Sequence, residues 1–173
     1  MDLTMPTTRQ VWRDPKTRPL WRRLLAIREP VIYEITDEPG YAYTARIDYQ
    51  PVQLFLPRGF RSDFATSPPF SWRLGFRPDG VLALGGLFHD FYYRHGFLLD
   101  PYGNRLFAGK GKSFADELIA EITAQMAGGE LPGRIAQASL TLFGWPAWWG
   151  GKKYRDKCAA NPGYIELNGD FGD

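Results

Sequence analysis

Hydrophobic positions divide the chain into a strand-rich stretch followed by helices. Residues 31–35 are β-branched and aromatic, and apolar runs return at residues 41–47 and 52–56. The turn signal Asp-Glu-Pro-Gly at residues 37–40 separates the first two runs. Short apolar runs divided by such residues are typical of antiparallel strands. We therefore predict a small antiparallel sheet over about residues 31–57.

Three later segments have helical periodicity. Residues 80–95 carry apolar side chains around most of the circumference, which predicts a buried helix that stops at Gly96. Residues 113–127 repeat an apolar side chain every four positions, which predicts an amphipathic helix. A third helix is expected after Pro132, up to about Phe143. The fold class is therefore α+β, with the sheet followed by a bundle of about three helices, the first two antiparallel.

Length and charge indicate one domain with two extensions. The 173 residues suit a single domain, which we place at residues 31–150. Residues 1–30 have a net charge of +4 and are interpreted as a basic N-terminal arm, and residues 151–173 as a C-terminal extension. The whole chain carries only +2, so no specific nucleic-acid partner is expected.

Composition also limits the compartment and the chemistry. The single cysteine, Cys158, excludes an intrachain disulfide and a zinc site built from several cysteines. No run approaches the roughly 18 apolar residues typical of a transmembrane segment. We expect synthesis in a cytoplasm.

Candidate chemistry centres on His89-Asp90-Phe91-Tyr92-Tyr93, in the middle of the first predicted helix. Helical spacing puts Tyr93 on the same face as His89, one turn later. Gly85 and Gly86 lie one turn earlier and weaken the helix by about 1 kcal/mol each relative to alanine. Close approach of another backbone or of a ligand would explain two glycines at this place.

Asp116, on the second predicted helix, is the candidate partner of His89. If the two helices pack antiparallel, its carboxylate reaches the imidazole, fixes the tautomer and leaves the other nitrogen as a base for water. Two alternatives remain open. Ser113 and Asp116 fit a capping box at the helix start, and His89 alone fits a buried core histidine.

Further candidates are a metal ligand and a group of binding residues. Asp90 points about 100° away from His89 around the helix, so it suits a cation such as calcium or a loop backbone better than its neighbour. The glycines and Arg94 adjoin the motif. Asp63 and Ser67 belong to the loop at residues 58–79, where they either bind a ligand or organise the loop itself.

Three stretches of the sequence resemble a family of phage and prophage proteins, the domain-of-unknown-function family numbered 1353. They are the loop at residues 55–68, the Leu-Phe-His-Asp-Phe-Tyr-Tyr-Arg motif at residues 87–94 and the Ala-Asp pair at residues 115–116. Ser62 and the Thr-Ser pair at residues 66–67 depart mildly from the family pattern. The resemblance implies a phage-encoded protein and supplies no function. For such a protein we expect synthesis in the host bacterial cytoplasm, association with the virion, and virion proteins as partners.

The motif His89-Asp90-x-x-Tyr93 with the later Asp116 also resembles the active-site helices of phospholipase A(2). That resemblance implies that His89 activates water, that Asp90 holds calcium, and that Tyr93 and Asp116 brace the histidine. The Gly-rich calcium loop that precedes the histidine helix in that family has no clear counterpart here.

The sequence thus supports two main hypotheses. The first is a phage-derived, phospholipase-A(2)-like hydrolase that acts on bacterial membrane lipid during entry or lysis. The second is a non-enzymatic tail or neck component in which the His-Asp-Tyr cluster is a buried polar network; a peptidoglycan hydrolase is a third. If the protein is an enzyme, we expect His89 at the floor of an open cleft. If the cluster is a structural network, we expect it to be sealed from solvent.

Three tryptophans fall within the five residues 145–149, just before Lys152, Lys153 and Arg155. We expect them to close the core over the third helix, because Pro146 and nearby glycines interrupt an amphipathic helix. The alternative is an exposed patch that meets lipid headgroups or an acidic partner surface.

Overall fold

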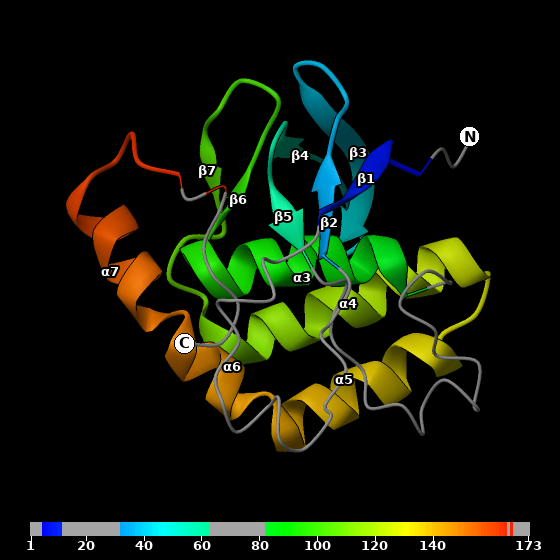
Figure 1. Ribbon diagram of the computed structural model, residues 1–173. Coiled ribbons are helices and arrows are strands. Elements are labelled where there is room, and N and C mark those ends of the chain that lie inside the picture. The colour runs from blue at the N-terminus through cyan, green and yellow to red at the C-terminus, as the bar shows by residue number, and fades with distance from the viewer. Residues whose placement is uncertain (1–4, 12–31, 63–81, 166, 168–173) are drawn as a thin grey trace, which may run out of the picture.

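The computed structural model describes residues 5–11, 32–62, 82–165 and 167, and they form an α+β fold (Figure 1). This confirms the predicted fold class. In Figure 1 the strands lie above, α3 and α4 lie beneath them, and α5 and α6 form the lowest layer. Within the described residues, no helix is both long and apolar enough to cross a membrane.

The strands form two antiparallel sheets. One has the order β1–β2–β5, made of Thr8–Val11, Ile32–Ile35 and Arg61–Ser62. The other has the order β3–β4–β6–β7, made of Gly40–Ile47, Gln50–Pro57, Leu98–Leu99 and Arg105–Leu106. The sheets extend beyond the expected region at residues 31–57, because β1 lies in the basic arm and pairs along its whole length with β2.

Five helices account for the rest of the described fold. They are α3 (Ala83–His95), α4 (Gly111–Ala127), α5 (Leu131–Phe143), α6 (Trp145–Gly150) and α7 (Lys152–Ala160). The first three match the predicted segments to within a few residues. α3 ends as expected, because Gly96 takes a left-handed conformation with φ of 77°.

Helices α3 and α4 run antiparallel in direct contact. The start of α3 meets the end of α4, since a Cβ added to Gly85 would lie 2.8 Å from Oγ1 of Thr123 and 3.0 Å from the carbonyl oxygen of Ile119. The end of α3 meets the start of α4, where Nζ of Lys112 lies 5.9 Å from the centroid of the Tyr93 ring. Close helix packing therefore explains the glycine at position 85.

The capping-box interpretation of Ser113 and Asp116 is wrong. α4 begins two residues earlier, at Gly111, and its N-cap Lys110 makes no side-chain capping bond. The positive φ of Gly111, 84°, directs the chain into the helix there. Ser113 and Asp116 thus lie inside α4, and the Asp116 side chain is available for contacts with the neighbouring helices.

Candidate functional site

His89 lies in the middle of α3 and is almost sealed, with 3% of its surface exposed. Its Nδ1 is 3.3 Å from Oδ1 of Asp90, and its Nε2 is 3.7 Å from Oδ1 of Asp116. The second distance is within the range of an ion pair but beyond a hydrogen bond. In the part of the chain that the structure describes, Nε2 has no hydrogen-bond partner. Both ring nitrogens therefore face a carboxylate.

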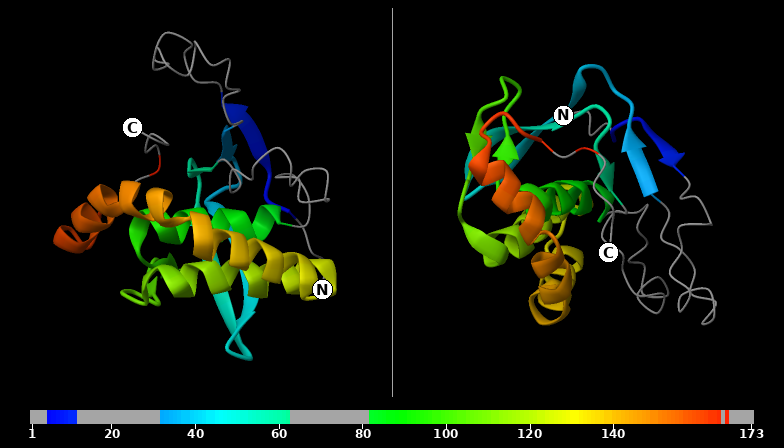
Figure 2. Two further views of the ribbon diagram at one scale, coloured as in Figure 1. Left: turned by 90° about the horizontal axis from the view of Figure 1, so that it is seen from below. Right: turned by 60° about the vertical axis from the view of Figure 1, so that its left-hand side comes forward.

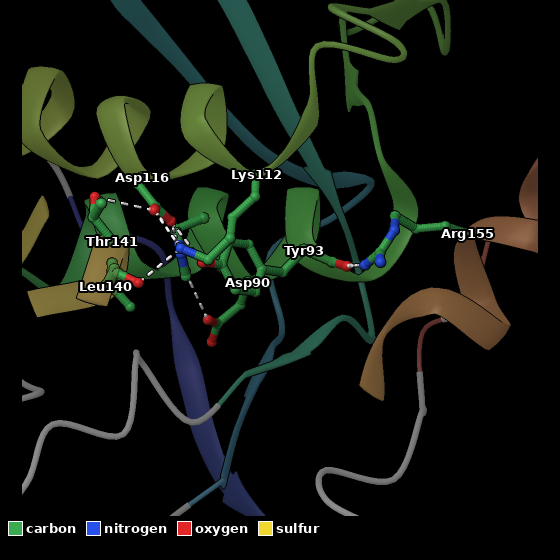
Figure 3. Close-up of polar contacts among 8 residues, drawn as sticks. Asp90, Tyr93, Lys112, Asp116, Leu140, Thr141 and Arg155 are labelled. Carbon is green, nitrogen blue, oxygen red and sulfur yellow. Dashed lines mark hydrogen bonds and ion pairs between the residues drawn. The ribbon is translucent and has the colours of Figure 1, made fainter. Parts of the chain in front are cut away.

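Asp116, 2% exposed, is the centre of the surrounding contacts. Its Oδ1 accepts a 2.6 Å hydrogen bond from the Tyr93 hydroxyl, and its Oδ2 accepts one of 2.5 Å from Nζ of Lys112. The Thr141 hydroxyl on α5 lies 3.3 Å from the same Oδ2. Lys112 also donates to the carbonyl oxygen of Leu140 at 2.7 Å (Figure 3). These contacts join α3, α4 and α5 through one buried carboxylate.

Asp90 lies beside Nδ1 of the imidazole, on the side opposite to Asp116. Its Oδ2 accepts a 2.5 Å hydrogen bond from the Ser62 hydroxyl at the end of β5. The expectation that Asp90 would turn away from His89 is wrong: rotation of the two side chains brings Oδ1 to Nδ1 despite the 100° offset of adjacent positions. Asp90 therefore ties α3 to the first sheet.

The Tyr93 ring lies against the His89 ring at a tilt of 41°, with ring centroids 3.9 Å apart, as the one-turn spacing predicts. Glycines make room for it, since a Cβ at Gly144 would lie 2.7 Å from its hydroxyl oxygen. Arg155 on α7 donates to the carbonyl oxygen of Tyr93 (Figure 3). The Trp148 ring meets the Tyr93 ring edge-on, with centroids 5.2 Å apart. We call His89, Asp90, Tyr93, Lys112 and Asp116 the polar cluster.

Burial and charge pairing act in opposite directions on the acid–base groups of this cluster. Burial lowers the pKa of His89, but the carboxylates of Asp116 and Asp90 outweigh it and leave the pKa raised above 6.5. Burial raises the pKa of Asp116, yet contacts with His89, Lys112 and Tyr93 hold it below 3.8. The pKa of Asp90 is lowered in the same way, against burial, by His89, Ser62 and Arg94. These contacts favour the ionised carboxylates and the imidazolium over their neutral forms.

The other predicted binding residues are separated from this cluster or lie outside the described residues. Gly85 serves helix packing, and Gly86 is buried in the first turns of α3. Arg94 is buried, with its guanidinium 5.1 Å from the centroid of the Phe60 ring, and it acts on Asp90 through its charge. Asp63 and Ser67 lie outside the described residues.

Sequence reasoning missed four members of the network. Lys112 was detectable, because Lys112 and Asp116 are an i, i+4 pair within one helix. Ser62, Thr141 and Arg155 are far from the motif in sequence, and only the packing of β5, α5 and α7 brings them to it. No local pattern marks such residues.

The described donors around Asp90 do not fit a calcium site. Calcium takes six to eight oxygen ligands. Here Asp90 is already engaged by the imidazole of His89 and the hydroxyl of Ser62, and the charge of Arg94 repels a cation. No group of three or more His, Cys, Asp and Glu side chains suited to a metal occurs among the described residues. Calcium binding by Asp90 stays a prediction.

The expectation that the tryptophans close the core is wrong for two of the three. Trp145 is 45% exposed and Trp149 is 63% exposed, with their rings 5.8 Å apart. Only Trp148 packs inward, against Tyr93 and under the guanidinium of Arg155 at 3.6 Å. α6 is too short to turn all three indoles toward α3.

No protein-family model, curated protein or solved structure matches the chain. The resemblances to the phage family and to phospholipase A(2) therefore stay predictions.

Proposed function

We propose that the protein is a non-enzymatic structural component of a phage particle, such as a tail or neck protein. The polar cluster then serves as a buried network that fixes α3, α4 and α5 against one another. The observation that carries this proposal is the imidazole of His89, which is 3% exposed and has a carboxylate at each nitrogen. The link to phages rests on the resemblance of the loop and helix motifs.

Protonation also favours a structural role. A general base must hold a free lone pair within reach of water at the working pH. The raised pKa of His89 favours its protonated form, in which neither ring nitrogen has a free lone pair. An imidazolium between two carboxylates fixes side-chain geometry, but it is a poor acceptor for the proton of a water molecule.

The phospholipase-A(2)-like hydrolase is the second candidate, and one observation favours it. The Tyr93 hydroxyl donates to Asp116, whose same oxygen faces Nε2 of His89, as the resemblance implies for the two bracing residues. In this hypothesis Nδ1 activates water after Asp90 moves aside, and the substrate is a bacterial membrane lipid.

A hydrolysis assay separates the two candidates. The purified protein is incubated with phospholipid vesicles, with and without millimolar calcium, beside His89→Gln and His95→Gln. His95 is the matched control, because it is buried in the same helix outside the polar cluster. We expect no hydrolysis by any of them. Calcium-dependent hydrolysis that is lost only in His89→Gln would establish the enzyme instead.

Incorporation into particles tests the structural role itself. Mass spectrometry of purified particles of a phage that carries this gene is expected to detect the chain at a fixed copy number per particle. A chain found only in the lysate, and never with particles, would contradict the proposal.

A further inference from the structure

Helix α5 has an apolar stripe that faces away from the protein. Leu131, Ile135, Ala138 and Leu142 follow the i, i+4, i+7, i+11 spacing of one helix face, and all four are exposed. The opposite face packs on α4 through Gly133, where an added Cβ would lie 2.5 Å from the carbonyl oxygen of Ala120. The stripe therefore takes no part in the packing of α5 on α4.

The apolar side chains continue from α5 into α6. Phe143 is 79% exposed, and the exposed Trp145 and Trp149 follow directly. We call Leu131, Ile135, Leu142, Phe143, Trp145 and Trp149 the outer apolar surface. These six residues are most of the large hydrophobic side chains that stand exposed in the described part of the chain. Concentrated exposure of this kind marks an interaction surface.

Positive charge follows the outer apolar surface along the chain. Residues 131–160 contain five Lys/Arg and one acidic residue, a net charge of +4, although the whole chain carries only +2. Lys153 and Lys157 are exposed one turn apart on α7, and neither forms an ion pair within the described residues. α5 and α6 lie on the side of the molecule away from the strands, and α7 continues from α6 toward β7 (Figure 2), where Arg105 donates to the carbonyl oxygen of Cys158.

We propose that this helical layer binds the surface of an anionic lipid membrane. Exposed Leu, Phe and Trp side chains suit the boundary between headgroups and acyl chains, and flanking lysines suit anionic headgroups. A second copy of the chain is a poorer occupant, because two such layers face to face would bring like charges together. The inference does not depend on the proposed role of the polar cluster.

Co-sedimentation with vesicles tests the proposal. The full chain is mixed with phosphatidylcholine vesicles that contain about 30% phosphatidylglycerol, and with pure phosphatidylcholine vesicles. We expect binding to the anionic vesicles, weaker binding to the neutral ones, and loss of the difference at high salt. No binding to anionic vesicles, or equal binding to both kinds, would overturn the proposal.

Two variants separate the apolar from the charged contribution. Leu142→Ser with Phe143→Ser is expected to weaken binding by about tenfold or more, since each buried apolar side chain contributes a large part of that factor. Lys153→Gln with Lys157→Gln is expected to weaken binding to anionic vesicles by about tenfold and to leave neutral vesicles unaffected. Unchanged binding by either variant would contradict the assigned surface.

Tyr102→Ser is the matched control. Tyr102 is 87% exposed and lies in the β6–β7 connection, at the opposite end of the molecule from α5 in Figure 1, so its loss should leave binding unchanged. Light scattering and thermal unfolding of the Leu142/Phe143 variant complete the test. A dimer that this variant breaks would assign the surface to a second copy. A large loss of stability in this variant would mean that another part of the chain covers the outer apolar surface. Either result overturns the lipid proposal.

Discussion

The two sides of helix α5 differ in the kind of side chain they present. On its inner side, the Leu140 carbonyl and the Thr141 hydroxyl complete a buried charged cluster around Asp116 and Lys112. On its outer side, Leu131 and Leu142 stand in solvent. A buried charged cluster and an exposed apolar patch are the two arrangements that call for a physical reason. The difference indicates that the inner side fixes the helix in place, and that the outer side is kept apolar for a partner.

Removing the charge of Asp116 should have the largest effect. Asp116→Asn leaves Lys112 and the His89 imidazolium buried without their carboxylate, and it should cost about 3–5 kcal/mol of folding free energy. Chemical denaturation measures the loss. Asp156→Asn is the control, because its pair with Lys152 is exposed and should contribute about 0.5 kcal/mol or less. Equal losses of folding free energy in the two variants would mean that the buried ion pair contributes no more to stability than the exposed one.

Replacing the buried pair as a whole should restore much of that loss. The double variant Lys112→Met with Asp116→Asn removes both charges and nearly retains side-chain volume, so it should be more stable than Asp116→Asn by about 2 kcal/mol. A double-mutant cycle by urea denaturation measures the coupling. Additive single effects would mean that Lys112 and Asp116 do not act as a pair.

The polar cluster should also set how stability depends on pH. The contribution of His89 is complete below pH 6.5 and is lost as pH rises through its raised folded pKa. The contributions of Asp90 and Asp116 are complete above 3.8 and are lost as pH falls through their lowered folded pKa values. The cluster therefore stabilises the fold most between these two values.

Denaturation across the pH range tests this dependence with His89→Gln as comparison. In the variant, the free energy of unfolding should no longer fall between pH 6.5 and the folded pKa of His89. It should still fall at acid pH. An identical profile for wild type and variant would show that His89 takes no part in the charge pairing.

The smallest effect on folding is expected on the outer side of α5. Leu142→Ser and Phe143→Ser should each change the free energy of unfolding by about 0.5 kcal/mol or less, because both side chains are already exposed. Thermal unfolding measures the change. A loss comparable with that of a core residue would mean that α5 is covered on both sides.

Local patterns were sufficient for the helices and for the centre of the site. Four-residue periodicity located α4, Pro132 and Gly96 marked helix ends, and one-turn spacing joined His89 to Tyr93. Local patterns were insufficient for residues whose position or exposure depends on tertiary packing. Ser62 and Thr141 join the network from β5 and α5 without a sequence signal, and the exposure of Trp149 depends on how the short α6 lies on α3.

The protonation state of His89 tests the central claim most directly. With only two histidines in the chain, nuclear magnetic resonance of the imidazole nitrogens, assigned with His95→Gln, follows His89 through a pH titration. The buried-network account predicts an imidazolium with both nitrogens protonated at pH 7 and a pKa above 6.5. A neutral imidazole at pH 7, with one free nitrogen and a pKa at or below 6.5, would contradict it and favour the general base of a hydrolase.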